Sequence, residues 1–509
     1  MENDYQRYRR QQEEAVSNNA GTSASEVLFA ILPNICSILL ALTLITLAGP
    51  QINKQTRILI EFCITIVPCV LCCTVLSEKV IAVSQIFLIV SAANIMLTLA
   101  CKPRDSFKAF PASQNASKLG FITNFRALTN IMTAVCILAV DFTCFPRKFV
   151  KTETYGYSLM DTGVGFYIIA NAIVSPEARS VEAIQKTPFF EGLKKTLKGC
   201  VPLIALGLIR FVSVELLGYQ RHVSEYGVHW NFFLTLACVK LFTGVLSKNL
   251  SSKYALPTGL WILAMHEYAL STKGLKEWVL SDEPRKDLLS ANREGWVSIP
   301  GYVGLYLLGI ALGKLIHSSY QKTTDNQLIF NIKFSGYQFH IEYTRSMFLT
   351  IKLYALASVA FYATYYCEQY FRISRRLANS GYCAWILTLS TLVLTFLLMI
   401  DVIMECITGC LRDKSRRKIS KQLRRDDLNA KESINIVKTL EIFEAINDNG
   451  LLFFLFANLL TGTINMAMKT LHADELRSLT VIITYMVVNV TFVLLRYRAR
   501  YILSAKKIN

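Results

Sequence analysis

Thirteen apolar runs restrict the fold of this chain more than any other feature of its sequence. Most have about 17–25 residues, which is the length that an α-helix needs to cross a bilayer. The runs are continuous rather than polar at every second residue, which excludes an outer-membrane β-barrel. We therefore predict an all-α polytopic membrane protein that forms a single domain over residues 1–509. The predicted spans are residues 27–48, 58–76, 80–100, 127–146, 159–174, 199–217, 229–246, 254–271, 299–317, 346–366, 382–404, 449–468 and 479–495.

Basic residues predict how these spans are oriented. Thirteen spans place the termini on opposite sides, and the C-terminal side then carries about 32 Lys and Arg against about 18 on the other. The positive-inside rule gives a luminal tail (1–26), a basic cytosolic loop (411–440) and a cytosolic tail (496–509). Lys506 and Lys507 in that last tail match the dilysine retrieval signal of the endoplasmic reticulum. A basic tail that snorkels to the membrane surface is the alternative.

Composition argues against two other functions. The formal net charge of +18 is largely explained by the loops, and no compact basic domain is present, so we predict no nucleic-acid partner. Most of the 14 cysteines lie inside apolar runs without paired CxxC motifs or histidines. We interpret them as small hydrophobic residues and predict no metal site.

The segment ILAVDFTCFPRKFVKTETYGYSLMDTGVG holds the most unusual combination of residues. Asp141 lies near the end of an apolar run, and Lys151 follows ten residues later. Pro146, between them, is expected to end the helix. Asp161 opens the next run. Ionisable groups at membrane depth are costly, so they mark either a functional site or a structural ion pair.

Other polar residues collect in the connections assigned to the luminal side. Charged and aromatic residues together at one membrane face suit a polar lipid headgroup. Two histidines of these connections, His222 and His229, are interpreted as interfacial hydrogen-bonding groups or headgroup contacts, with a general base as the alternative. A zinc site that adds Glu225 would need a third well-placed ligand. The candidate substrate-binding residues are Arg147, Lys148, Asp161, Arg221, His222, His229, Asn231, Asn292 and Arg293.

Five blocks together resemble the glycosylphosphatidylinositol (GPI) inositol-acyltransferase family. The resemblance extends from the N-terminal AVSNNAGTS to the last span, and the blocks occur in the family's order. The first block is the segment quoted above. The others are GYQRHVSEYGVHWNFFLTL, NREGWVSIPGYVGLYLLG, RISRRLANSGYCAWIL and NDNGLLFFLFANLLTGTINMAMKTL.

The resemblance implies an enzyme with thirteen spans in the endoplasmic reticulum membrane. Such an enzyme transfers a fatty acyl chain, usually palmitoyl, from acyl-CoA to the inositol 2-hydroxyl of glucosaminyl-phosphatidylinositol, an early GPI-anchor precursor. Acyl-CoA is then a co-substrate, and no cofactor is bound. The partners are glucosaminyl-phosphatidylinositol, acyl-CoA and the lipid bilayer. The family's Asp–Lys pair matches Asp141 and Lys151. Asp141 would act as base or hold Lys151, and Lys151 would stabilise the oxyanion or contact a phosphate.

Two other classes stay open on the residues alone. A transporter or lipid scramblase would line its path with the charged groups, but the two halves of the sequence do not show the inverted repeats that such a fold predicts. A non-catalytic assembly subunit would tolerate the loss of Asp141 and Lys151. His222 or His229 is the reserve base if Asp141 is not the proton acceptor.

Overall fold

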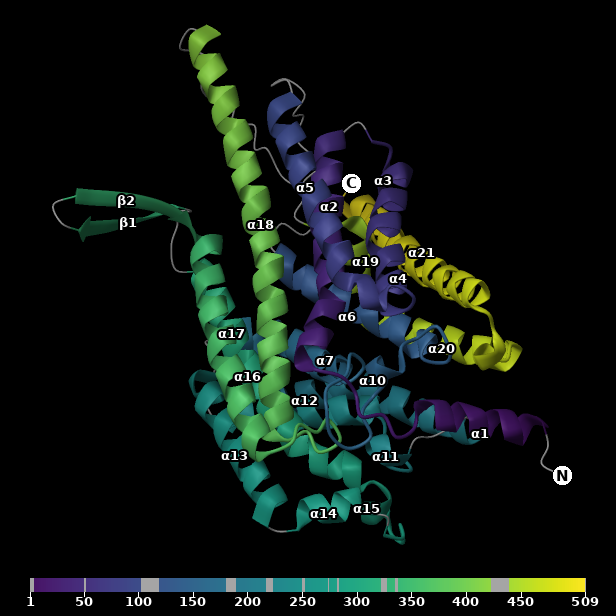
Figure 1. Ribbon diagram of the computed structural model, residues 1–509. Coiled ribbons are helices and arrows are strands. Elements are labelled where there is room, and N and C mark those ends of the chain that lie inside the picture. Colours follow the sequence, from purple (N-terminus) through teal and green to yellow (C-terminus); the bar gives the residue numbers. More distant parts are fainter. Residues whose placement is uncertain are drawn as a thin grey trace. The chain divides into compact units, whose positions relative to one another are not determined.

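The computed structural model describes residues 4–49, 52–101, 119–179, 189–216, 223–249, 252–272, 274–281, 283–321, 327–334, 337–422 and 439–508. The chain divides into two compact units, which Figure 1 shows with the element labels used below. The first unit comprises residues 1–24 and 147–392. The second comprises residues 25–146 and 393–509. A single domain over 1–509 stays a prediction.

The second unit is built around α6 (Gly120–Ala139), whose residues are almost all buried. Helix α6 packs against α19 (Glu441–Asp448), α20 (Gly450–Ala467) and α21 (Glu475–Ile508). The remaining helical elements of this unit are α2 (Ala24–Ala48), α3 (Lys54–Glu61), the π-helical turn η1 (Phe62–Ile66), α4 (Val67–Cys73), η2 (Ser77–Lys79), α5 (Val80–Cys101), most of α18 (Ser380–Gln422) and η6 (Thr470–His472).

The first unit is organised by α16 (Arg293–Gln321), and α13 (Ala255–Thr272) runs alongside it (Figure 1). Gly259 and Gly304 allow this approach, because a Cβ atom at Gly259 would lie only 3.1 Å from the carbonyl oxygen of Gly304. The other helical elements are α1 (Asp4–Val16), η3 (Arg147–Phe149), α7 (Thr162–Ala172), α8 (Pro176–Arg179), α10 (Phe189–Leu216), α11 (Val223–Tyr226), α12 (Phe232–Asn249), η4 (Ser252–Tyr254), α14 (Leu275–Leu280), α15 (Leu288–Ala291) and α17 (Arg345–Tyr370).

Within the described residues, nine helices are long and apolar enough to cross a membrane. The prediction of a helical multi-span membrane protein is confirmed, whereas thirteen spans are not. The four remaining predicted runs coincide with helices α7, α10, α12 and α13, so each run is helical. Helices α7 and α12 contain shorter apolar segments. Helix α10 carries lysines in its first half, which lower its hydropathy.

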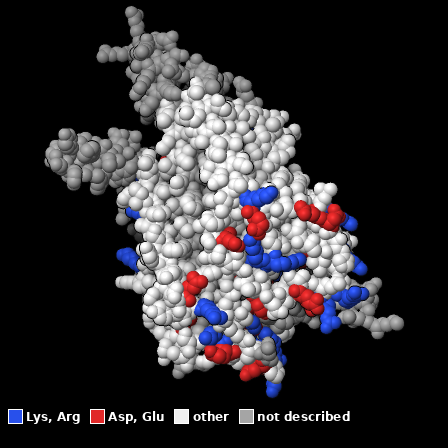
Figure 2. All heavy atoms as spheres, viewed as in Figure 1, with Lys and Arg blue, Asp and Glu red and all other residues white. Residues whose placement is uncertain are grey.

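Large apolar side chains remain exposed along several of these helices, as expected for surfaces that face lipid rather than water. On α5, the exposed residues include Ile89 and Met96, and on α17 they include Ile351 and Tyr362. Figure 2 shows one face of the molecule, on which wide areas carry no charged side chain. This pattern agrees with a protein that has lipid around much of its surface.

A β-hairpin departs from the all-α prediction. Strands β1 (Gln327–Phe334) and β2 (Tyr337–Thr344) pair antiparallel, with Gln327 opposite Thr344. The sequence of β2, YQFHIEYT, and the second half of β1, FNIKF, alternate apolar and polar residues, which is the pattern of a strand. The segment lies between two long helices, and the search for long apolar runs does not detect this short-period alternation.

Candidate functional site

Five segments assigned to the luminal side by sequence contact one another within the first unit. They are the N-terminal tail (1–26, up to residue 24 in this unit) and the connections 147–158, 218–228, 272–298 and 367–381. The described part of the 218–228 connection begins at residue 223. Together these segments form one polar layer, and most of the predicted site residues belong to it.

The N-terminal tail holds the backbone of the loop that carries Lys151. The side-chain amide of Asn19 donates to the carbonyl oxygens of Val150 and Lys151, the second at 3.4 Å. In return, the backbone N–H of Glu153 donates to the carbonyl oxygen of Asn19 at 3.1 Å. The tail predicted only as a luminal extension therefore helps to shape the 147–158 connection.

Two glycines allow the tail and this connection to come so close. The N–H of Thr22 donates to the carbonyl oxygen of Tyr157 at 2.7 Å. Gly21 has φ +79°, and a Cβ atom there would lie 2.2 Å from that same carbonyl oxygen. Gly156 has φ +125°, and its Cβ would lie 2.4 Å from the carbonyl oxygen of Ala20. A side chain at either position would push the backbone of the N-terminal tail away from that of the 147–158 connection.

Lys151 forms an ion pair with Glu225 of α11. The ammonium nitrogen lies 2.7 Å from Oε1 of the carboxylate. The Lys151 side chain is 34% exposed and the Glu225 side chain 23% exposed, so a ligand can reach both groups. The neighbouring Tyr226 is partly buried, and this burial raises the pKa of its hydroxyl to about 12, so the hydroxyl stays protonated at neutral pH.

Asp161 is fully buried at the start of α7, and its carboxylate has three donors. Nε of Arg375 donates to Oδ1 at 2.6 Å. The hydroxyl and the N–H of Thr152 donate to Oδ2 at 2.7 and 3.2 Å. Tyr382 donates its hydroxyl to the backbone carbonyl of Asp161 at 2.8 Å. The Asp161–Arg375 pair therefore fixes the 147–158 connection to the segment before α18, and substrate binding by Asp161 stays a prediction.

Asn292 fixes the connection that carries the histidines. Its side-chain oxygen accepts from the N–H groups of His229 and Trp230 at 2.7 and 3.0 Å. The side-chain amide lies 3.3 Å from Nδ1 of His229, whose ring is exposed. Asn231 is buried and donates to the carbonyl oxygen of Gly207 at 2.8 Å, while its side-chain oxygen accepts from the first N–H groups of α12. The exposed imidazole is thus presented from a rigid loop.

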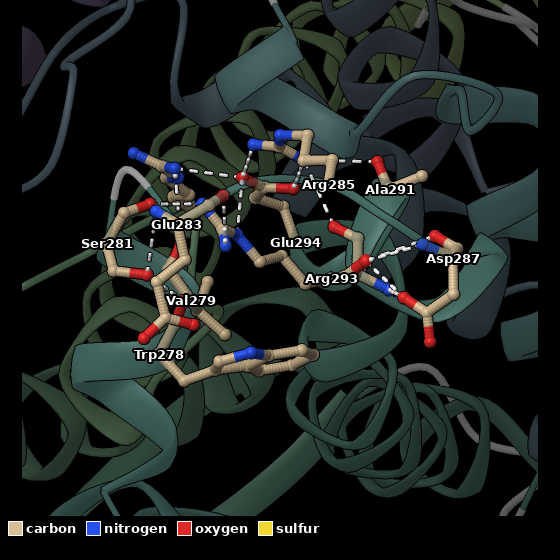
Figure 3. Close-up of polar contacts among 11 residues, drawn as sticks. Trp278, Val279, Ser281, Glu283, Arg285, Asp287, Ala291, Arg293 and Glu294 are labelled. Atoms are coloured by element: carbon tan, nitrogen blue, oxygen red, sulfur yellow. Dashed lines mark hydrogen bonds and ion pairs between the residues drawn. The ribbon is translucent and has the colours of Figure 1, made fainter.

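Glu294 is fully buried and is surrounded by three guanidinium groups (Figure 3). Arg285 donates to both carboxylate oxygens at 2.6 and 2.9 Å, and Arg376 donates to Oε1 at 2.9 Å. Nε of Arg293 lies 3.8 Å from Oε1. The three guanidinium groups also donate to backbone carbonyls of the 272–298 connection, those of Val279, Ser281, Glu283, Ser290 and Ala291.

This arginine cluster (Arg285, Arg293, Glu294 and Arg376) joins the 272–298 and 367–381 segments of the polar layer. Guanidinium groups suit the task, because each presents several donors in one plane and stays charged when buried. Arg293, a candidate substrate-binding residue whose charge would suit a phosphate, is 2% exposed, and its two terminal nitrogens donate to loop carbonyls. Its phosphate contact stays a prediction.

Asp141 belongs to the second unit, where it follows the end of α6. Its Oδ2 atom accepts from the side-chain amide of Asn465 on α20 at 2.7 Å. Asp141 is partly exposed. The carboxylate therefore has a neutral hydrogen-bond donor that can hold its orientation without neutralising its charge.

The other predicted residues have simpler surroundings. Arg147 and Lys148 lie in η3 and are partly exposed, and the ammonium of Lys148 lies 5.5 Å from the centre of the Phe149 ring. Arg221 and His222 lie outside the described residues. The metal-free character of the protein also stays a prediction.

Sequence reasoning missed several residues that shape this layer. Arg375 and Arg376 lie in RISRRLANSG, where two adjacent arginines follow an apolar run, and this charge density is the signal that could have identified them. Glu225 lies among the polar residues of a predicted luminal connection, but nothing in the sequence marks it as the partner of Lys151. Asn19 gives no signal of its own, because an asparagine in a polar tail is ordinary.

The fold defines a multi-span helical membrane protein in which connections between helices form a polar layer. Comparison with known proteins narrows the class. The GWT1 family model matches residues 8–496. A Bos taurus relative, glucosaminyl-phosphatidylinositol-acyltransferase PIGW, is 32% identical over 93% of this chain and 95% of its own length. GPI-anchored wall transfer protein 1 of Candida albicans is 34% identical over 72% of each chain.

A relative from Homo sapiens, also named glucosaminyl-phosphatidylinositol-acyltransferase PIGW, is 31% identical over 87% of this chain and 88% of its own. The matches extend over nearly the whole sequence, at identities above 30%. The chain therefore belongs to the GWT1 family of GPI inositol acyltransferases, and the family resemblance seen in the sequence is confirmed.

Proposed function

We propose that this protein transfers a fatty acyl chain, palmitoyl in particular, from acyl-CoA to the inositol 2-hydroxyl of glucosaminyl-phosphatidylinositol. The observation that carries the proposal is the family match over residues 8–496, because it includes every candidate site residue. The relatives from Bos taurus and Homo sapiens are named for the same acceptor lipid. The product is an inositol-acylated GPI-anchor precursor.

The reaction needs a base for the hydroxyl proton and positive charge for the developing oxyanion. Asp141 takes the proton of the inositol hydroxyl while the hydroxyl oxygen bonds to the thioester carbonyl carbon. Lys151 stabilises the resulting oxyanion. The C–S bond then breaks, and CoA leaves as a thiolate that is protonated to the thiol. The residue roles come from the family resemblance, and His222 or His229 remains the reserve base.

Headgroup binding is assigned to the polar residues around Lys151. Arg147, Lys148, Arg221 and Arg293 supply charge for the phosphates of CoA or of the lipid. Carboxylate, amide and imidazole groups orient the sugar and inositol hydroxyls. We assign this second role to Asp161, His222, His229, Asn231 and Asn292.

The protein is proposed to cross the endoplasmic reticulum membrane thirteen times, with its N-terminus in the lumen and its C-terminus in the cytosol. Contacts among the five segments support their placement on one side of the membrane, since loops on opposite membrane faces could not touch. The positive-inside rule makes that side the lumen. The polar layer would then face the lumen. The basic loop 411–440 and the dilysine tail would face the cytosol.

An assay on membranes tests the function directly. Membranes with and without this protein are incubated with radiolabelled palmitoyl-CoA and glucosaminyl-phosphatidylinositol. We expect labelled, inositol-acylated lipid only where the protein is present. Accumulation of normal amounts of the acylated lipid without the protein would refute the assignment.

A further inference from the structure

Glu225 differs from the buried carboxylates of the first unit in its exposure and in its ionic partner. Asp161 and Glu294 are fully buried, and each is neutralised by arginine in a fixed arrangement. Glu267 is 9% exposed and accepts from the backbone N–H of Ser380. Glu225 is 23% exposed, and it forms an ion pair with a lysine.

The Lys151–Glu225 pair is suited to exchange. A lysine ammonium is a compact point charge on a flexible stem, whereas an arginine holds a carboxylate with a planar fork. A partly exposed lysine–carboxylate pair contributes little to stability, so a competing ammonium can displace the lysine at small cost. The distance of 2.7 Å shows that the carboxylate accepts a primary ammonium in good hydrogen-bond geometry.

The acceptor lipid of the proposed function carries such a group. Its glucosamine has a primary amine, which is protonated at neutral pH and is chemically equivalent to the end of a lysine side chain. The amine distinguishes this acceptor from an otherwise identical lipid with a neutral sugar. A carboxylate is suited to this distinction, because it forms an ion pair with the ammonium that it cannot form with a neutral hydroxyl.

We infer, on the basis of the proposed function, that Glu225 binds the ammonium group of the acceptor's glucosamine, which replaces Lys151 as its ionic partner. The exchange has a second consequence. Once released, the ammonium of Lys151 is free to face the developing oxyanion. Binding of the correct headgroup thereby provides the cation that the acyl transfer needs, and a lipid without the amine leaves Lys151 held by Glu225.

A comparison of two acceptors tests the inference. One is glucosaminyl-phosphatidylinositol, and the other is glucosyl-phosphatidylinositol, in which a hydroxyl of similar size replaces the amine. The wild-type protein should prefer the amine-bearing lipid by about ten- to a hundredfold in kcat/KM, the effect of one charge-assisted hydrogen bond. In Glu225→Gln this preference should fall to within about threefold, chiefly through a higher KM for the amine-bearing lipid.

Two further variants sharpen the result. Glu225→Asp keeps the carboxylate and should retain part of the preference. Glu277→Gln is the matched control, because Glu277 lies on α14 of the same unit, is 65% exposed and pairs with Lys276; its preference should equal that of the wild type.

The outcomes separate the two proposals. A wild-type protein that acylates neither lipid refutes the proposed function. If it acylates both equally well, the inference fails even if no variant folds. Retention of the full preference by Glu225→Gln also overturns it, as does an equal loss of kcat on both acceptors, which would show that Glu225 only positions Lys151.

Discussion

At the scale of single residues, charge and its counter-charge decide the behaviour of the polar layer. Lys151 has a partly exposed partner in Glu225, and Asp141 has a neutral donor in Asn465. Both groups therefore keep the exposure that a reaction needs. Asp161 is different, because it is fully buried and neutralised by Arg375.

Substitution of the proposed catalytic residues should abolish turnover and leave the fold intact. Loss of a general base or of an oxyanion stabiliser typically costs about a hundred- to ten-thousandfold in rate, so we expect this loss for Asp141→Asn and for Lys151→Ala. The measurement is acyl transfer by variants of matched yield in detergent. Lys276→Ala serves as control, since Lys276 is exposed on α14. If Asp141→Asn retains more than about a tenth of the rate while His229→Ala is inactive, the imidazole is the base.

Arg375 should be needed for folding. Arg375→Met leaves the buried carboxylate of Asp161 without its guanidinium, and an uncompensated buried charge typically costs about 3–5 kcal/mol. We expect poor yield and a lower Tm in a thermal-shift measurement. The double variant Asp161→Asn with Arg375→Met removes both charges and should recover most of the yield. Unchanged thermal stability of Arg375→Met would show that the pair does not hold the layer together.

At the scale of elements, the N-terminal tail and the 147–158 connection stabilise one another. The tail's helix α1 is polar and would be marginal alone. It is followed by residues whose backbone docks on the loop of Lys151. The shape of that loop is thus a tertiary property that depends on a segment more than a hundred residues away.

Gly21→Ala should release the tail. Its Cβ atom would lie 2.2 Å from the carbonyl oxygen of Tyr157, and its positive φ is strained for alanine. We expect faster trypsin cleavage near Arg10 in the detergent-solubilised protein, together with reduced acyl transfer. Gly462→Ala is the control, because a Cβ atom there meets nothing within 4 Å and alanine favours the helix. Equal cleavage of both variants would contradict the proposed docking.

At the scale of the whole molecule, membrane orientation controls which substrates reach the polar layer. Five segments of the first unit share one face, so a single marker can report the side of all five. An N-glycosylation acceptor placed in the 272–298 connection should be modified. One placed in 411–440 should remain bare, and glycosidase-sensitive mobility on gels distinguishes the two. Glycan on the natural sequon at Asn115, which the predicted topology assigns to the cytosol, would reverse the orientation.

Much of the architecture could be predicted because hydropathy is a local property. A run of about twenty apolar residues has to satisfy its own backbone hydrogen bonds in lipid, so it becomes a helix whatever its neighbours are. Within the described residues, all thirteen runs coincide with helices for this reason, including the four that fall short of the length or the hydropathy of a span. The hairpin of β1 and β2 escaped prediction because its signal is short and lies between far longer apolar runs.

By itself, the sequence determined the class of protein, the family, the helices and the polar connections in which the site residues lie. Only the tertiary structure decided which charges are paired: Lys151 with Glu225, Asp161 with Arg375, and Glu294 with its three arginines. The partners are 74 to 214 residues apart for the first two pairs. Sequence spacing carries no information about such pairings, because an ion pair depends on distances of a few ångströms that arise only when separate helices pack.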